Sequence, residues 1–164
     1  MDKAYDISIT NDAQPDDHNP LRGCTSSQID AVTIAAFLKR NLDCMTRWKC
    51  GKRSRERLLM WITWHLARLN VCCVQDPSGK LIAVGIARPL KDLEESRFPH
   101  MVNEAGKFVF CDHVVAKTNE SLKALLRYAA WRFPHAEYIS FHRSKNGSAL
   151  KTYELKKFLQ KAKV

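Results

Sequence analysis

The chain has 164 residues, of which 45% are hydrophobic and 27% are charged, values typical of one folded globular domain. No run approaches the ~18 consecutive apolar residues of a membrane helix, and the first residues lack the basic and apolar segments of a signal peptide. These features exclude a membrane-spanning or secreted protein and predict a cytoplasmic one. The formal net charge is +10, and a body this basic attracts anionic partners such as nucleic acid, phosphorylated cofactors or an acidic protein.

The charge and the cysteines indicate how the chain is organised. Residues 1–20 hold five acids and one base, so they predict an acidic flexible arm, and residues 21–164 predict a single domain. The six cysteines include no CxxC pair, so no metal site is expected. In a reducing compartment they are expected to be small, buried, reduced side chains.

Two helices are predicted first. Ser26 or Ser27 can cap a helix that runs to about Arg40, with an apolar stripe formed by Ile29, Val32, Ala36 and Phe37. Ser54 can cap a second helix that runs through Leu69. Its residues 58–66 are apolar nearly all round, which predicts burial on most sides.

Strands dominate the second half. Residues 70–74 and 81–90 predict a β-hairpin around the turn at 76–79, and 107–116 predicts a central strand with apolar residues on both faces. A helix should follow from Thr118 or Asn119 to Pro134, and then a strand over 138–143. The tail 151–159 fits either a strand or a helix. This order predicts an α/β domain built on one mixed sheet.

The same order resembles the GNAT acyltransferase fold, and residues 62–155 look similar to the toxin-activating lysine acyltransferases. The resemblance rests on a DPSG turn, the return strand LIAVGIARPL, the run KFVFCDHVVA, a helix ending in RFP, and KTYEL. It implies transfer of an acyl group from a thioester donor, acyl-CoA or acyl carrier protein, to an amine. It also implies a catalytic Asp on the central strand, where Asp112 stands, together with a His from the N-terminal helical part.

The sequence departs from that pattern in two places. Residues 21–64 contain no histidine, so His65, at the far end of the second helix, is the candidate there. The stretch AKTNES, which follows the central strand, lacks the glycines of the loop that holds the acyl-CoA pyrophosphate in GNAT enzymes.

Asp112 and His65 are the candidate catalytic residues. Asp112 is expected on one strand face with Phe108, Phe110 and Val114, with His113 on the opposite face. Desolvation should raise the pKa of Asp112, so it could accept a proton from an attacking amine or orient a histidine. The alternative is an Asp hydrogen-bonded to backbone or to an Arg. His65 is either a base or a satisfied core histidine.

Lys117, Thr118 and Asn119 are the candidate residues for binding the donor. They precede a helix N-terminus, where free amides and the helix dipole can hold a phosphate and Lys117 adds positive charge. The alternative is plain helix capping by Thr118.

A basic cluster around Trp48 is the candidate interface for an acidic partner. It could follow a phosphate backbone with Trp48 stacked on a base, or dock an acidic carrier protein, or be a solvated surface. A lysine-rich stretch at the C-terminus is a second basic region of the sequence. A non-enzymatic module that keeps the fold and binds nucleic acid or an acidic protein is therefore the alternative function. The cluster consists of Arg47, Trp48, Lys49, Lys52, Arg53, Arg55 and Arg57.

Overall fold

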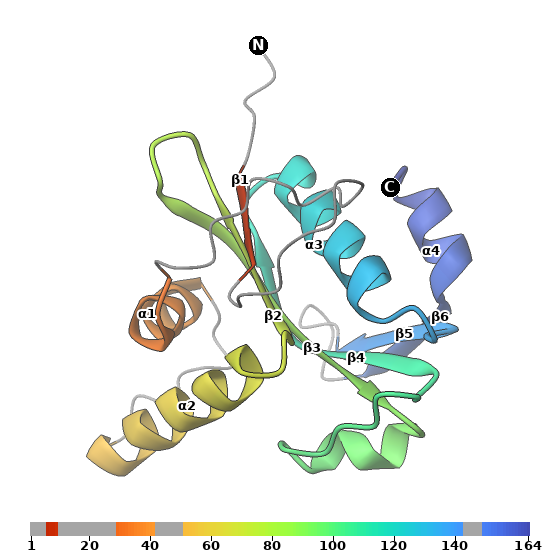
Figure 1. Ribbon diagram of the computed structural model, residues 1–164, viewed down its shortest axis with the longest axis horizontal. Coiled ribbons are helices and arrows are strands. Elements are labelled where there is room, and N and C mark those ends of the chain that lie inside the picture. The colour runs from red at the N-terminus through yellow and green to blue at the C-terminus, as the bar shows by residue number, and fades with distance from the viewer. Residues whose placement is uncertain (1–5, 10–28, 42–50, 143–148) are drawn as a thin grey trace.

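The computed structural model describes residues 6–9, 29–41, 51–142 and 149–164, with residues 6–9 and 51–53 described through their backbone alone. This part of the chain forms one six-stranded sheet in which the strands follow one another in chain order (Figure 1). The strands are β1 (Asp6–Ile9), β2 (Val71–Gln75), β3 (Leu81–Leu90), β4 (Phe108–Ala116), β5 (Tyr138–His142) and β6 (Leu150–Glu154). β4 and β5 are parallel, and the other neighbouring strands are antiparallel.

Helices cover both faces of the sheet. α1 (Ala31–Asn41) and α2 (Gly51–Leu66) lie on one face, and α3 (Asn119–Arg132) and α4 (Leu155–Lys161) lie on the other (Figure 1). A short 3-10 helix, η3 (Leu93–Arg97), connects β3 to β4. The predicted α/β fold class is confirmed, with two N-terminal helices, a hairpin, a central strand, a helix and a strand in GNAT-like order.

β1 lies inside the interval predicted as a flexible arm. Residues 6–9 pair antiparallel with β2, with Asp6 opposite Gln75 and Ile9 opposite Cys72. The prediction missed this strand because the sparse apolar residues of the arm give no clear alternation. The remaining residues of 1–20 lie outside the described part of the chain.

The first two helices differ from their prediction in face and ends. In α1 the buried residues are Ile34, Ala35, Phe37 and Leu38, whereas the predicted stripe residues Val32 and Ala36 are exposed. Asp30 caps α1, since its carboxylate accepts a hydrogen bond from the backbone amide of Thr33 at 2.8 Å. Ser26 and Ser27 lie outside the described residues.

α2 begins before the predicted cap and ends sooner. It runs from Gly51, so Ser54 is inside the helix, and it stops at Leu66 because Leu69 adopts a positive φ of 60°. Met60 is 71% exposed, so one side of this helix faces solvent although its residues are apolar there. Its buried face includes Leu58, Ile62 and His65.

The ambiguous tail contains both predicted alternatives. Residues 150–154 form β6 at the edge of the sheet, and 155–161 form α4, which packs back onto β5 through Leu155 and Phe158. None of the described helices has the length and apolar character needed to cross a bilayer.

Candidate active site: a buried acid and a gap beside the central strand

β4 carries one extra residue at Asp112. His113 pairs with Ile86 and Cys111 pairs with Ala87, so Asp112 has no partner of its own on β3. This β-bulge turns Asp112 and His113 to the same face of the sheet. Asp112 meets the side chain of Arg88, and the ring of His113 lies 5.6 Å from that of Trp61 on α2.

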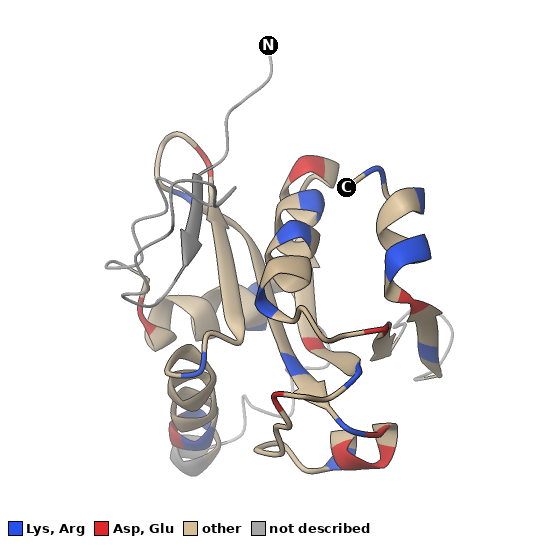
Figure 2. Cartoon of the chain, turned by 45° about the vertical axis from the view of Figure 1, so that its right-hand side comes forward, with Lys and Arg blue, Asp and Glu red and all other residues tan. Residues whose placement is uncertain are grey.

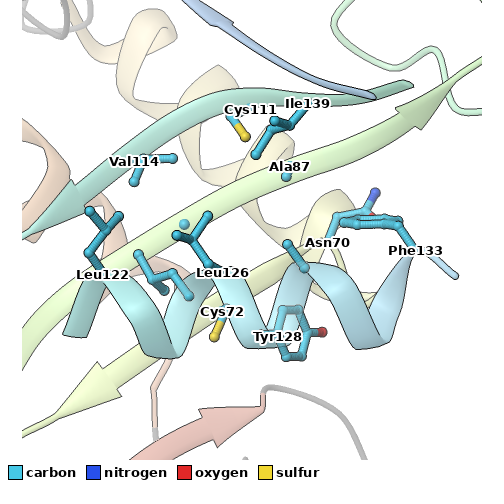
Figure 3. Close-up of a pocket in the computed structure, with 13 residues that line it drawn as sticks. Asn70, Cys72, Ala87, Cys111, Val114, Leu122, Leu126, Tyr128, Phe133 and Ile139 are labelled. Atoms are coloured by element: carbon cyan, nitrogen blue, oxygen red, sulfur yellow. The ribbon is translucent and has the colours of Figure 1, made fainter. Parts of the chain in front are cut away.

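The bulge corrects the predicted faces. Simple alternation placed Asp112 with Val114 and placed His113 opposite, with Cys111. In the structure Val114 and Cys111 both face the cavity under α3 (Figure 3), while Asp112 and His113 share the α2 side. An extra residue shifts the alternation by one, and the sequence pattern contains no signal for it.

Arg88 of β3 is fully buried and uses all five of its N–H groups. Nε and Nη2 donate to the Asp112 carboxylate, with Nε–Oδ2 2.8 Å and Nη2–Oδ1 3.2 Å. Nη2 also donates to the carbonyl of Ser96 at 2.7 Å, and Nη1 donates to the carbonyls of Phe98 and Met101. The guanidinium therefore ties the η3 segment to the two central strands.

The Asp112 carboxyl is held in this arrangement. Its side chain is only 12% exposed, and both oxygens accept hydrogen bonds from Arg88. Burial raises the pKa of Asp112 to about 6, against the positive charge and hydrogen bonds of Arg88, which lower it. This is the alternative weighed from the sequence, an Asp hydrogen-bonded to an Arg. Arg88 itself was missed, although it stands in β3 two residues after Ile86, at a position that strand alternation turns to the core.

His65 is buried and is held among aromatic rings. The rings of Trp61 and Trp64 contact it edge-on, with centroids at 4.5 and 4.9 Å. Asn70 Nδ2 lies 3.3 Å from Nδ1, and because Asn70 Oδ1 faces Arg132, the amide nitrogen donates and Nδ1 accepts.

The environment of His65 strongly favours the neutral ring. Burial, together with the charges of Arg88 and His100, lowers the pKa of His65 to about 3. Its accepting nitrogen is already occupied by Asn70, so the proton of the neutral ring sits on Nε2. Nε2 is buried and has no hydrogen-bond partner among the described residues, so His65 is a core histidine, but only one of its two ring nitrogens is satisfied.

The candidate donor-binding residues stand at the start of α3. Thr118 and Ser121 form a capping box, in which Thr118 Oγ1 accepts from the Ser121 amide at 3.1 Å and Ser121 Oγ accepts from the Thr118 amide at 3.2 Å. Asn119 is exposed in the first turn. The Lys117 ammonium lies 5.5 Å from the centre of the Phe37 ring on α1. Thr118 is thus a helix cap, and Lys117 and Asn119 are exposed beside it.

The pairing of β4 with β5 ends midway along β4, and we call the unpaired edge of residues 112–116 the β4–β5 gap. Their parallel pairing ends at Cys111 and Phe141, whereas β4 continues to Ala116. Among the described residues no strand pairs with the free edge of residues 112–116. Val114 and Leu122, on either side of this region, are 40% and 37% exposed.

A small apolar cavity of about 40 Å³ lies next to this divergence, between α3 and the sheet (Figure 3). Val114 and Cys111 of β4, Ile139 of β5, and Leu122 and Leu126 of α3 contribute to its walls. Its volume holds only a few water-sized groups, so side chains fill most of the space between α3 and the sheet.

The basic cluster is only partly described. Arg47, Trp48 and Lys49 lie outside the described residues, and Lys52 and Arg53 are placed in the first turn of α2 through their backbone alone. Arg55 and Arg57 are exposed on α2.

Comparisons with known proteins assign no family to the chain. No protein-family model matches the chain, and no curated protein matches it. A solved structure of an acetyltransferase of the GNAT family from Listeria monocytogenes 4b F2365 is similar, with 10% sequence identity and a TM-score of 0.46 over 81% of this chain and 79% of that one. At that score and identity the similarity carries no argument about either fold or activity. The GNAT-like order of helices and strands rests on the topology of the sheet itself.

Proposed function

We propose that this chain is an acyltransferase-type domain that binds an acyl thioester, acyl-CoA or an acylated carrier protein, between β4 and β5. The observation that supports it is the end of β4–β5 pairing at Cys111 and Phe141, beyond which β4 continues. Backbone N–H and C=O groups on that edge can bond to an extended chain as they would to an added strand. The pantetheine arm of both donors is an extended, amide-bearing chain of this kind.

The side chains around the gap fit the two ends of such a donor. Val114 and Leu122 offer half-exposed apolar surface to an acyl group. Lys117 and Asn119 lie where β4 leads into α3, and the first turn of α3 offers amides and a positive dipole end to the donor phosphate. Thr118 contributes by fixing the start of that helix.

In the proposed reaction an acceptor amine attacks the thioester carbonyl. The C–N bond forms, the C–S bond breaks, and the leaving sulfur takes up the proton that the amine loses. Asp112 and His65 were the expected proton acceptors, but Arg88 holds both oxygens of the first and Asn70 occupies the accepting nitrogen of the second. We therefore propose that the protein promotes acyl transfer by positioning the donor and the amine. The proton of the amine then passes to the leaving sulfur through water.

The test is a comparison of two substitutions at exposed apolar positions. Leu122→Glu places a charge at the gap, and Met60→Glu places the same charge on α2, away from it. Acetyl-CoA, octanoyl-CoA and an octanoylated carrier protein are each added to the full chain, and thermal unfolding is followed. A lysine peptide and mass spectrometry report transfer.

We expect at least one thioester to raise the melting temperature of the wild type and of Met60→Glu, but not that of Leu122→Glu. The same thioester should acylate the peptide. If no thioester shifts any of the three proteins, or if Leu122→Glu responds like the wild type, the proposal fails.

A further inference from the structure

A cluster of aromatic rings and lysines lies at the β6 edge of the sheet, on β5, β6 and α4. Tyr153 of β6 stacks on Phe141 of β5, with centroids at 5.7 Å and planes 24° apart, and lies 5.4 Å from Phe158 of α4. Phe141 and Phe158 are half-buried, so they hold the tyrosine ring in place. Tyr153 itself remains 39% exposed.

Exposed lysines belong to the same two elements, β6 and α4, as Tyr153 and Phe158. Lys151 lies two residues from Tyr153 on β6, so both side chains leave the same face of the strand, the face on which α4 packs. Lys156, Lys161 and Lys163 are exposed on α4 and just beyond it, and basic residues line this helix in Figure 2. We call Phe141, Tyr153, Phe158 and these four lysines the aromatic–lysine surface.

The charge of this surface is nearly all positive. Residues 149–164 contain five lysines and one acid, Glu154. The ammonium of Lys157 lies 2.7 Å from that carboxylate, so this pair is locally neutral. The four lysines of the surface remain as the local excess of positive charge.

We infer that the aromatic–lysine surface binds single-stranded nucleic acid. A fixed, half-exposed ring can stack on an unpaired base, and the ammonium groups around it can contact the phosphates on either side. A duplex keeps its bases stacked on each other, so it would use the charges but not the ring. An acidic protein could bury the same ring, and competition by polyglutamate, which carries the charge but no bases, tests the contribution of charge alone.

This inference goes beyond the proposed acyl transfer. Phe141, at which β4–β5 pairing ends, borders both sites, but the substitutions that test the surface replace other residues. The probe is a fluorescein-labelled oligothymidylate of about 12 nucleotides, within the usual site size for single-strand binding. Its binding to the full chain is measured by fluorescence polarisation at several salt concentrations, with circular dichroism as a check of folding.

Two pairs of charge reversals separate the site from the net charge. Lys151→Glu with Lys156→Glu changes the surface, and Lys91→Glu with Lys107→Glu makes the same charge change at exposed positions near η3 and the start of β4. We expect the first pair to weaken binding at least tenfold more than the second. It should also reduce the salt slope by about 1.4, since each single-strand phosphate contact contributes roughly 0.7.

Tyr153→Leu tests the ring. It keeps an apolar side chain against Phe141 and Phe158 but removes the stacking face, and we expect binding to weaken by about fivefold or more. The inference is overturned if the oligonucleotide does not bind, if the two charge-reversal pairs behave alike, or if Tyr153→Leu binds like the wild type. It is also overturned if a duplex or polyglutamate competes as well as unlabelled single strand.

Discussion

The guanidinium of Arg88 and the carboxylate of Asp112 form a two-point contact, with Nε–Oδ2 2.8 Å and Nη2–Oδ1 3.2 Å, at the bulge of the central strand. The remaining N–H groups of Arg88 donate to three backbone carbonyls between Ser96 and Met101. One buried side chain thus joins β3, β4 and the segment from η3 to Met101. In this protein the central acid supports the fold.

Replacing Arg88 with methionine should destabilise the protein strongly. The substitution leaves the Asp112 carboxylate buried beside three carbonyls that have lost their donor, and we expect the free energy of unfolding to fall by about 3–5 kcal/mol in urea titrations. The control is Arg97→Met, which removes an exposed ion pair to Glu94 and should cost less than about 1 kcal/mol.

Adding Asp112→Leu to Arg88→Met should recover part of that loss, because the uncompensated charge is removed. An Arg88→Met protein within about 1 kcal/mol of the wild type would contradict the structural role of the pair.

His65 should make stability depend on pH. Its pKa is about 3 in the folded protein and 6.5 in the unfolded chain, so its contribution is complete above pH 6.5 and is lost as the pH falls toward 3. The loss from pH 7 to pH 5 is about 2 kcal/mol. Asp112 acts in the opposite direction, since its pKa is raised to about 6 and its protonation favours the folded state as the pH falls.

The measurement is therefore the difference in unfolding free energy between the wild type and His65→Gln at each pH. Relative to the wild type, the variant should gain about 2 kcal/mol between pH 7 and pH 5. His135→Gln, at an exposed position, serves as the matched control and should follow the wild type. Parallel pH curves for wild type and His65→Gln would refute the prediction.

Cys73 and Cys111 should resist alkylation in the folded protein. Both are buried, and burial raises the pKa of each thiol to about 12, so the reactive thiolate is scarce at pH 8. Iodoacetamide treatment followed by peptide mapping should leave both unmodified in buffer and modify both in denaturant. Because Cys111 lines the cavity beside the β4–β5 gap, its modification in the native protein with Cys73 still protected would mean that this gap opens in solution.

Gly106→Ala should be more harmful than Gly79→Ala. A Cβ on Gly106 would overlap the backbone carbonyl of Leu90, which cannot move without shifting β3. Gly79 has a φ of +82° but open space around it, so alanine there costs only the positive-φ strain, about 1 kcal/mol. Thermal denaturation should show Gly106→Ala melting at the lower temperature, and equal melting temperatures would contradict the prediction.

Much of the sheet could be predicted because its signals are local. The DPSG turn and the apolar runs on either side of it predict β2 and β3, and the β-branched run before Ala116 predicts β4. Thr118 and Pro134 bracket α3 closely. Each of these depends on residues that are neighbours in sequence.

The site could be predicted only in part, because it depends on pairing between distant residues. The bulge at Asp112 is a property of the β3–β4 register, and no single-strand pattern reveals it. Arg88 offered a signal: a charged residue in a strand, in phase with Val84 and Ile86, needs a buried acid, and Asp112 was already the expected buried acid. The sequence thus contained both partners but not their contact.

The agreement between strand order and chain order bears on how this protein is made. As the nascent chain leaves the ribosome, β2 through β6 can each pair with the strand synthesised just before it. Between β4 and β5, which are parallel, α3 forms the crossover connection. β1 is the exception, since it is synthesised before β2 and the described helices α1 and α2 both lie between the two strands in the chain. We therefore expect the β1 edge of the sheet to be completed last, although β1 is translated before the other described strands.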